Sequence, residues 1–251
     1  FCSRDRIGIK PLYYTLQDGM LIFGSEIKSI LQHPSVSPEM NMLQLPNYLN
    51  FGMTGNTDSL FANIHKIPAA TNLTFDAKGE VKMSQYWSSL TENTEYTALG
   101  EKDIHEEILR ILRAAVEDRM MSDVPFGVFL SGGIDSSVNV ALMHELMDRP
   151  IDTYSVGFKE LEKYNELKYA RQIAKQFNTN HREILIDSED AFPILNDLVW
   201  HEDEPNADPV CMPLYFLSKL TRDSGTTVIQ VGEGSDEQFV DVLPVHPVGE
   251  C

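Results

Sequence analysis

The stretch that most constrains the fold is GVFLSGGIDSSVNVALM, residues 127–143. It holds an apolar run, Val128-Phe129-Leu130, then two glycines bracketed by serines, and a second apolar run directly afterwards. Glycines let a chain turn sharply between two buried elements, and the serines and Asp135 put polar groups in that turn. The pattern predicts a strand over 126–130, a Gly/Ser turn and a helix over 137–147.

The same alternation of strand and helix continues through the chain from about residue 102. The expected helices cover 103–120, 164–177, 188–200 (with Ser188 as its cap) and 212–221, and the expected strands cover 153–158, 182–186 and 227–231. Strands separated by helical crossovers form a parallel sheet that helices cover on both faces. The predicted fold class is therefore α/β, with a doubly wound, Rossmann-like sheet.

Residues 1–87 are instead rich in β-strand patterns. Residues 12–16 and 20–23 flank the turn sequence QDG, and a second hairpin is expected between 72–75 and 81–86. A short helix is expected at 25–31, with Ser25 able to cap it. The polar stretch 88–101 is expected to be a linker. We therefore expect an α+β region before the parallel sheet.

Charge and cysteine content exclude several classes of function. The formal net charge is −18, which disfavours binding to nucleic acid or anionic membranes through a general basic field. No apolar segment approaches the roughly 18–20 residues of a membrane span. The cysteines, Cys2, Cys211 and Cys251, lie far apart without a CxxC pair, which argues against a disulfide framework or a zinc cluster. We expect a cytoplasmic protein that acts on a small molecule, with no nucleic-acid or membrane partner.

The loop over residues 131–137 has the composition of a phosphate-binding loop. Its glycines let backbone N–H groups turn inward, the following helix presents its positive N-terminus, and Ser131, Ser136 and Ser137 add hydroxyl donors. The spacing fits neither a Walker A loop nor G-x-G-x-x-G. A glycine-rich tight turn with a serine helix cap is the alternative on composition alone.

A second loop, GEGSDE at residues 232–237, follows the last expected strand. Mg²⁺ on a polyphosphate is usually held by one or two carboxylates together with phosphate oxygens. Asp135 from the first loop and Asp236 from the second would supply that pair if their strands are neighbours. The alternative is an acidic surface turn.

These motifs together resemble a known family. SGGIDSS after an apolar strand resembles the PP-loop of ATP pyrophosphatases, and MSDVPFGVFLSGGIDSS, YSVGF and VGEGSDEQF together are similar to glutamine-dependent asparagine synthetases. SRDRIGIKPLYY with FGSEIKSIL resembles the end of their N-terminal-nucleophile glutaminase domain. The resemblance implies that 1–87 is the C-terminal part of that domain, 102–239 is the N-terminal half of the PP-loop synthetase domain and 240–251 is an atypical tail.

The resemblance implies an ATP-dependent ligase that converts aspartate to asparagine with ammonia from glutamine, through a β-aspartyl-adenylate and with release of AMP and pyrophosphate. ATP and Mg²⁺ are the implied cofactors, small molecules are the implied partners, and a homodimer is allowed. The residues implied to bind ATP and pyrophosphate are Leu130, Ser131, Gly132, Gly133, Asp135, Ser136, Val156, Val231 and Gly232. Asp135 and Asp236 are implied to bind Mg²⁺, and Glu233 to be the general base toward the attacking ammonia.

The sequence departs from the family at both ends, so we expect a fragment. The family's glutaminase uses a cysteine at its mature N-terminus, but Cys2 lies in a late segment of that domain and is expected to be an ordinary strand cysteine. The glutamine-binding segments are absent, which predicts no glutaminase activity. After residue 239 the sequence no longer resembles the family, whose continuation carries a lysine that contacts the ATP phosphates. The chain alone is expected to be impaired.

The segment HEDEPNADPVCMP, residues 201–213, is a third departure. Asn206 and Pro209 fall roughly where asparagine synthetases offer a threonine and an arginine to aspartate, and neither clamps a carboxylate as arginine does. Asn206 and Asp208 are the candidate acceptor-binding residues, and HEDE is interpreted as an acidic turn rather than a metal site. The alternatives are an amidotransferase for another carboxylate, such as a cell-wall or polysaccharide intermediate, another PP-loop enzyme, and a catalytically inactive remnant.

Overall fold

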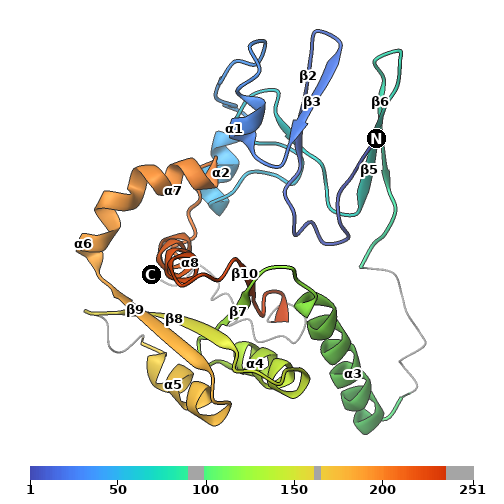
Figure 1. Ribbon diagram of the computed structural model, residues 1–251. Coiled ribbons are helices and arrows are strands. Elements are labelled where there is room, and N and C mark those ends of the chain that lie inside the picture. Colours follow the sequence, from blue (N-terminus) through green and yellow to red (C-terminus); the bar gives the residue numbers. More distant parts are fainter. Residues whose placement is uncertain (90–98, 161–164, 236–251) are drawn as a thin grey trace, which may run out of the picture. The chain divides into compact units, whose positions relative to one another are not determined.

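The computed structural model describes residues 1–89, 99–160 and 165–235 and divides the chain into two compact units (Figure 1). The first unit comprises residues 1–97 together with 194–211, and the second comprises 98–193 together with 212–251. The chain therefore leaves the second unit after residue 193 and returns to it at residue 212.

The second unit is built on a four-stranded parallel sheet. Its strands are β7 (Phe126–Phe129), β8 (Asp152–Phe158), β9 (Asn180–Ile186) and β10 (Val228–Gln230). The strands lie in the order β10-β7-β8-β9, and each neighbouring pair is parallel. This arrangement confirms the predicted α/β fold class.

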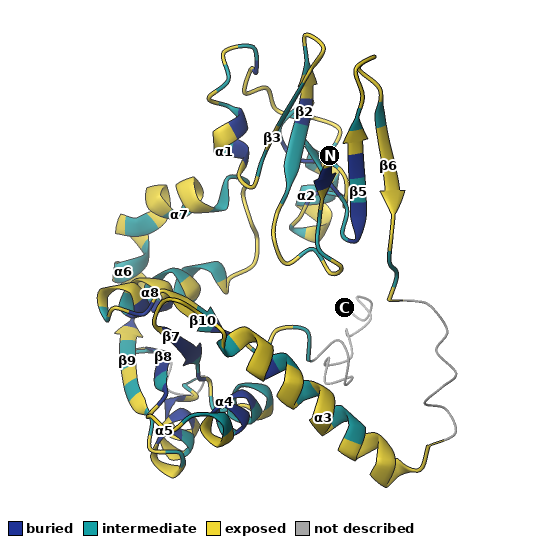
Figure 2. Cartoon of the chain, turned by 45° about the vertical axis from the view of Figure 1, so that its right-hand side comes forward, coloured by how far each residue is buried: buried dark blue, intermediate teal, exposed yellow. Residues whose placement is uncertain are grey.

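Helices cover both faces of this sheet. The helices described in this unit are α3 (Glu101–Met120), α4 (Ile134–Leu146), α5 (Leu167–Gln176), α6 (Ser188–Ala191) and α8 (Cys211–Asp223). Figure 1 shows α4 and α5 on one side of the sheet and α8 on the other. Val128, Val140 and Met143 are fully buried in the core between β7 and α4. Figure 2 shows this buried layer as the dark segments of the strands and helices.

The described part of the first unit contains two small antiparallel sheets and three helices. One sheet has the order β1-β5-β6 and the other β3-β2-β4. The elements are β1 (Cys2–Ser3), β2 (Tyr13–Gln17), β3 (Met20–Gly24), β4 (His65–Lys66), β5 (Thr71–Phe75), β6 (Val81–Gln85), α1 (Ile27–Ile30), α2 (Leu45–Phe51) and α7 (Leu195–Glu202). Both predicted hairpins, β2–β3 and β5–β6, are confirmed. Cys2 is a buried strand residue paired with Leu73, as expected.

The charged residues of the SRDRIGIKP segment support its backbone. The guanidinium of Arg4 donates to the carbonyl oxygens of Ile67, Gly8 and Lys10 at 2.6, 2.9 and 2.9 Å. The carboxylate of Asp5 accepts from the backbone N–H groups of Ile9 and Lys10 at 2.9 and 3.0 Å. The segment is therefore a loop fixed by its own side chains.

Three expectations about helix starts were wrong. The helix expected over 188–200 is divided into α6, a 3-10 turn at Phe192–Ile194 and α7, because Pro193 has no N–H to continue an α-helix. Its cap is Asp187 instead of Ser188. The Asp187 carboxylate accepts from the N–H groups of Glu189 and Asp190 at 3.0 and 3.1 Å, and Asp190 accepts from the Asp187 N–H at 2.9 Å.

Ser25 does not cap the short helix α1, which begins at Ile27 and has no side-chain cap from its own N-cap residue. The carboxylate of Asp203 takes that place and accepts from the N–H groups of Ile27 and Lys28 at 2.7 and 3.3 Å. The helix after the Gly/Ser turn also starts earlier than expected, at Ile134 rather than 137.

Some expectations fall outside the described residues. They are most of the linker 88–101, Asp236 and the tail 240–251. Among the described residues, no helix combines the length and apolar character that a membrane crossing requires.

Candidate functional site

Two loops meet at one edge of the parallel sheet. The chain passes from β7 to β8 on one side, while β10 lies on the other side of β7, so the carboxyl end of β7 is a switch point in strand order. Ligands of open α/β sheets bind at such points. Gly232, just after β10, lies so close to the first loop that a Cβ atom on it would be 3.0 Å from Asp135 Cβ. The two strands are neighbours, which is the condition on which the expected pairing of Asp135 with Asp236 depends.

The serine hydroxyls close the first loop on itself. Ser131 Oγ accepts from the Gly133 N–H at 3.1 Å and lies 3.0 Å from Ser136 Oγ, which accepts from the Ser131 N–H at 3.3 Å. Ser137 Oγ donates to the Gly133 carbonyl at 2.6 Å. The loop is thus a preformed turn at the start of the 13-residue helix α4, where backbone N–H groups and the helix dipole favour an anion.

Gly132 is required by both conformation and space. Its φ is +91°, in the region that residues with a side chain rarely adopt. A Cβ atom on it would lie 2.5 Å from Ala170 N and from Tyr169 Cβ, at the first turns of α5. The loop therefore packs directly on α5, and this contact was not visible from the spacing of the motif.

The neighbouring strand end is held by hydrogen bonds to Leu130 and Phe158. Leu130 is buried, donates its N–H to the Tyr154 carbonyl at 2.8 Å and accepts from the Ser155 hydroxyl. Beyond the half-buried Val156, the side chain of Asn165 accepts from Phe158 N at 3.0 Å and donates to Phe158 O at 2.8 Å. Asn165 was missed from the sequence, because its position in a loop between a strand and a helix gave no local signal.

The second loop has its expected residues at the surface. Val231 and Glu233 are exposed and Gly232 is half-buried. Ser235 Oγ donates to the Gly232 carbonyl at 3.0 Å, and Gly234 has a φ of +88°. Asp236, the second expected Mg²⁺ ligand, lies outside the described residues.

The two candidate acceptor residues belong to the first unit, whereas both loops belong to the second. Asn206 and Asp208 are exposed. Asn206 Oδ1 accepts from the Asp208 N–H at 3.0 Å, and Asp208 Oδ1 accepts from the Val210 N–H at 2.9 Å. Both side chains therefore support turns in their own loop.

Two other features of the second unit bear on ligand binding. A hollow of about 680 Å³ lies between α8 and the sheet, lined among others by Phe129, Arg222 and Val231, so Val231 is shared between it and the second loop. Within the described ranges, no group of three or more histidine, cysteine, aspartate or glutamate side chains is arranged to hold a metal ion.

Two family models match this chain. Residues 1–87 match the family model for a glutamine amidotransferase domain, and residues 107–246 match the model for asparagine synthase. A putative glutamine-hydrolyzing asparagine synthetase 2 of Methanocaldococcus jannaschii is 36% identical over 95% of this chain and 46% of its own length. Glutamine-hydrolyzing asparagine synthetase 1 of Bacillus subtilis is 32% identical over 94% of this chain and 36% of its own length.

Among solved structures, a glutamine-dependent NAD+ synthetase from Acinetobacter baumannii in complex with adenosine diphosphate is 17% identical over 85% of this chain and 47% of that chain, with a TM-score of 0.39. A TM-score that low supports no conclusion about this chain. The chain spans about half, or less, of the length of the two curated relatives. Because the asparagine synthase model matches more than half of its residues, this chain belongs to the asparagine synthase family.

Proposed function

We propose that this chain is part of a cytoplasmic ATP-dependent ligase that amidates aspartate to asparagine with ammonia from glutamine. The aspartate carboxylate attacks the α-phosphorus of ATP, pyrophosphate leaves, and ammonia displaces AMP from the β-aspartyl-adenylate. The proposed partners are small molecules, ATP, a carboxylate and ammonia, and a homodimer is the proposed assembly. Family membership and the matches to named asparagine synthetases support this assignment.

The observation that carries the proposal is the contact between the two loops at the switch point. Gly232 lies against Asp135, so a phosphate chain held by the first loop would also meet the second. The proposed pyrophosphate-binding residues are Ser131, Gly132, Gly133, Asp135 and Ser136, and Leu130, Val156, Val231 and Gly232 are proposed to frame the nucleotide. Glu233 is the proposed base that takes a proton from the attacking ammonia, because it is the carboxylate next to Gly232, the residue that lies against Asp135.

The described residues fit Mg²⁺ bound together with a polyphosphate. Asp135 offers a hard carboxylate ligand beside the proposed phosphate loop, and Mg²⁺ usually takes one or two carboxylates and completes its shell with phosphate oxygens and water. The lack of a larger ligand cluster in the described part of the chain agrees with that mode. Asp236 is the second proposed ligand. The metal would neutralise charge on the leaving pyrophosphate.

The test is ATP–pyrophosphate exchange by the chain with Mg²⁺ and aspartate in ammonia-free buffer. We expect exchange that depends on aspartate and that Asp135→Asn abolishes. The matched control is Asp148→Asn, which changes an exposed aspartate just after α4 and should leave the rate unchanged. Equilibrium binding of ATP with Mg²⁺ gives a second readout, which Asp135→Asn should weaken at least tenfold. A folded chain that shows neither exchange nor ATP binding would refute the proposal.

A second candidate function, amidation of another carboxylate, is favoured by the acceptor segment. The side chains of Asn206 and Asp208 are engaged in turns of their own loop, and residues 203–210 contain neither lysine nor arginine. An anionic amino acid is normally held by a cation. Silence with aspartate and exchange with another acid from a panel of carboxylates would move the assignment to this alternative.

A further inference from the structure

Two acidic residues directly after α7 are held by groups far away in the sequence. Asp203 ends α7 with a φ of +62°, which is unusual for a residue with a side chain. Its carboxylate accepts from the N–H groups of Ile27 and Lys28 and forms an ion pair with Lys28 Nζ at 2.9 Å. Only 9% of its side chain is exposed. A strained backbone conformation persists only when surrounding contacts hold it, so these contacts fix the position of Asp203.

The next residue, Glu204, has a second anchor. Its Oε2 accepts from Thr54 Oγ1 at 3.2 Å and lies 3.5 Å from Lys66 Nζ, and 13% of its side chain is exposed. Its Oε1 is buried and has no hydrogen-bond partner in the described part of the chain. A buried carboxylate is tolerated only when it is paired, so the lysine and the threonine are needed where they are.

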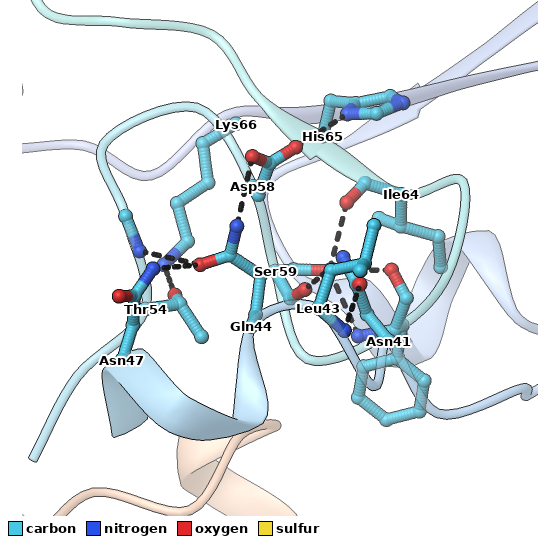
Figure 3. Close-up of polar contacts among 12 residues, drawn as sticks. Asn41, Leu43, Gln44, Asn47, Thr54, Asp58, Ser59, Ile64, His65 and Lys66 are labelled. Atoms are coloured by element: carbon cyan, nitrogen blue, oxygen red, sulfur yellow. Dashed lines mark hydrogen bonds and ion pairs between the residues drawn. The ribbon is translucent and has the colours of Figure 1, made fainter. Parts of the chain in front are cut away.

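The side chains that bind Glu204 are also held by contacts among residues of the first unit (Figure 3). Lys66 Nζ donates to Thr54 Oγ1 at 2.5 Å, in the same first unit. Gln44 joins the start of α2 to this region, because its Oε1 accepts from the Gly55 N–H at 3.2 Å and its Nε2 donates to Asp58 Oδ2 at 3.1 Å. The residues that bind Glu204 are therefore part of a network of hydrogen bonds.

The charge states agree with this arrangement. Burial alone would lower the pKa of Lys28, but its hydrogen bonds to Asp203 and Glu26 outweigh burial and raise that pKa. Burial raises the pKa of Tyr13 to about 12, and the charges of Glu204 and Asp203 add to the increase. Lys28 therefore stays protonated across the neutral range.

The loop that follows, residues 205–210, makes a third contact, with the end of α2. The Ala207 N–H donates to the Gly52 carbonyl at 3.4 Å, at the glycine that ends α2. A Cβ atom on Gly52 would lie 2.9 Å from Ala207 Cβ, so the two backbones approach closely. This loop carries Asn206 and Asp208, the residues proposed to face the carboxylate acceptor.

We propose that Asp203 and Glu204 are positioning residues that latch the acceptor loop, 205–210, onto residues 1–87, the region that matches the glutamine amidotransferase domain. The proposal rests on the function proposed above, because that function gives the loop its role. Lys28 and Lys66, which lie in the amidotransferase-like region and have no part in adenylation chemistry, then determine how well the chain recognises its carboxylate substrate.

The test compares Asp203→Gly with Lys28→Met in the exchange assay. Glycine adopts a φ of +62° without strain, so Asp203→Gly removes the latch contacts and leaves the backbone relaxed. Both variants should raise the KM for the carboxylate about tenfold and leave the KM for ATP unchanged, and the double variant should be no worse than the worse single variant. Asp203→Asn, which keeps an oxygen to accept from Ile27 N–H, should restore part of the loss.

The matched control is Lys82→Met, which removes a largely exposed lysine of the same unit and should change neither KM. Hydrogen exchange of the Ile27 and Lys28 amides is the second readout, and Asp203→Gly should accelerate it at least tenfold. Unchanged KM values in an active chain would overturn the latch while the proposed function stands, and an equal rise in both KM values would overturn it as a specific device. If the wild-type chain shows no ATP–pyrophosphate exchange with any carboxylic acid tested, the proposed function fails. Unchanged hydrogen exchange of the Ile27 and Lys28 amides in Asp203→Gly overturns the latch independently.

Discussion

Replacing Gly132 by alanine tests whether the phosphate-type loop is fixed by its contact with α5. Two separate effects are expected. A side chain at a φ of +91° introduces strain of about 1–2 kcal/mol. A Cβ atom 2.5 Å from Ala170 N and Tyr169 Cβ forces a backbone shift that costs about 1–3 kcal/mol more. We therefore expect Gly132→Ala to destabilise the second unit by about 2–5 kcal/mol.

Gly225→Ala separates the two effects. Gly225 lies in the same unit with a φ of +84°, and a Cβ atom on it would meet nothing within 4 Å. Alanine also reduces the entropy of the unfolded chain, by a similar amount at both positions, so this contribution cancels. The difference between the two variants should be the contact alone, about 1–3 kcal/mol.

The assay has to report on the second unit. Both tryptophans of the chain, Trp87 and Trp200, belong to the first unit, so fluorescence would follow the wrong part. Native-state hydrogen exchange of the β7 and β8 amides measures the required free energy. If Gly132→Ala destabilises these strands no more than Gly225→Ala does, the close approach to α5 does not constrain the loop, and the steric argument is refuted.

Three further predictions concern single side chains. Burial raises the pKa of Tyr13 from its ordinary value near 10 to about 12, so the stabilisation is full below pH 10 and is lost as the pH rises through 12; after discounting for solvent access it amounts to roughly 1–2 kcal/mol. Urea unfolding followed by tryptophan fluorescence should show this alkaline loss in the wild type and not in Tyr13→Phe, and parallel losses would contradict it. Asn165→Ala leaves the N–H and C=O of Phe158 without their side-chain partner, which should cost about 1–3 kcal/mol and accelerate exchange of the Phe158 amide; an unchanged rate would argue against the role of Asn165. Burial alone would raise the pKa of Glu183, but hydrogen bonds from Arg171 outweigh it and lower that pKa, so this stabilisation is present above the ordinary value near 4.5 and is lost as the pH falls below it. In Glu183→Gln, the free energy of unfolding, measured by circular dichroism, should therefore fall less steeply as the pH is lowered. Identical slopes in the variant and the wild type would disprove a stabilising role for the contact between Glu183 and Arg171.

The parallel sheet and its two loops were predictable because their signals are local. Apolar runs followed by glycines marked β7 and β10, and the rule for ligands at strand ends then placed Asp135 near the second loop. The break between α6 and α7 was also visible in principle, since Pro193 stands in the middle of the helix that the periodicity suggested.

The latch was out of reach of sequence reasoning for a physical reason. The N-terminus of α1 lies next to Ser25, a good local cap, yet the carboxylate that binds it belongs to Asp203. No sequence pattern around Lys28 or Lys66 identifies Asp203 or Glu204 as a partner. The HEDE run at residues 201–204 predicted only an acidic turn. Pairings of this kind depend on tertiary packing, and the same holds for the fit of Gly132 against α5.

The division of the chain into interleaved units has a consequence for its synthesis. Asp203 is made 176 residues after Ile27, the residue whose N–H it binds. At roughly 5–20 residues per second, about 9 to 35 seconds pass on the ribosome between the two. During that time β7, β8 and β9 emerge while α1 still lacks its cap. The unit whose synthesis begins first is therefore completed only after residues 98–193 of the second unit have been made, and a ribosome that stalls before residue 203 would leave it unfinished.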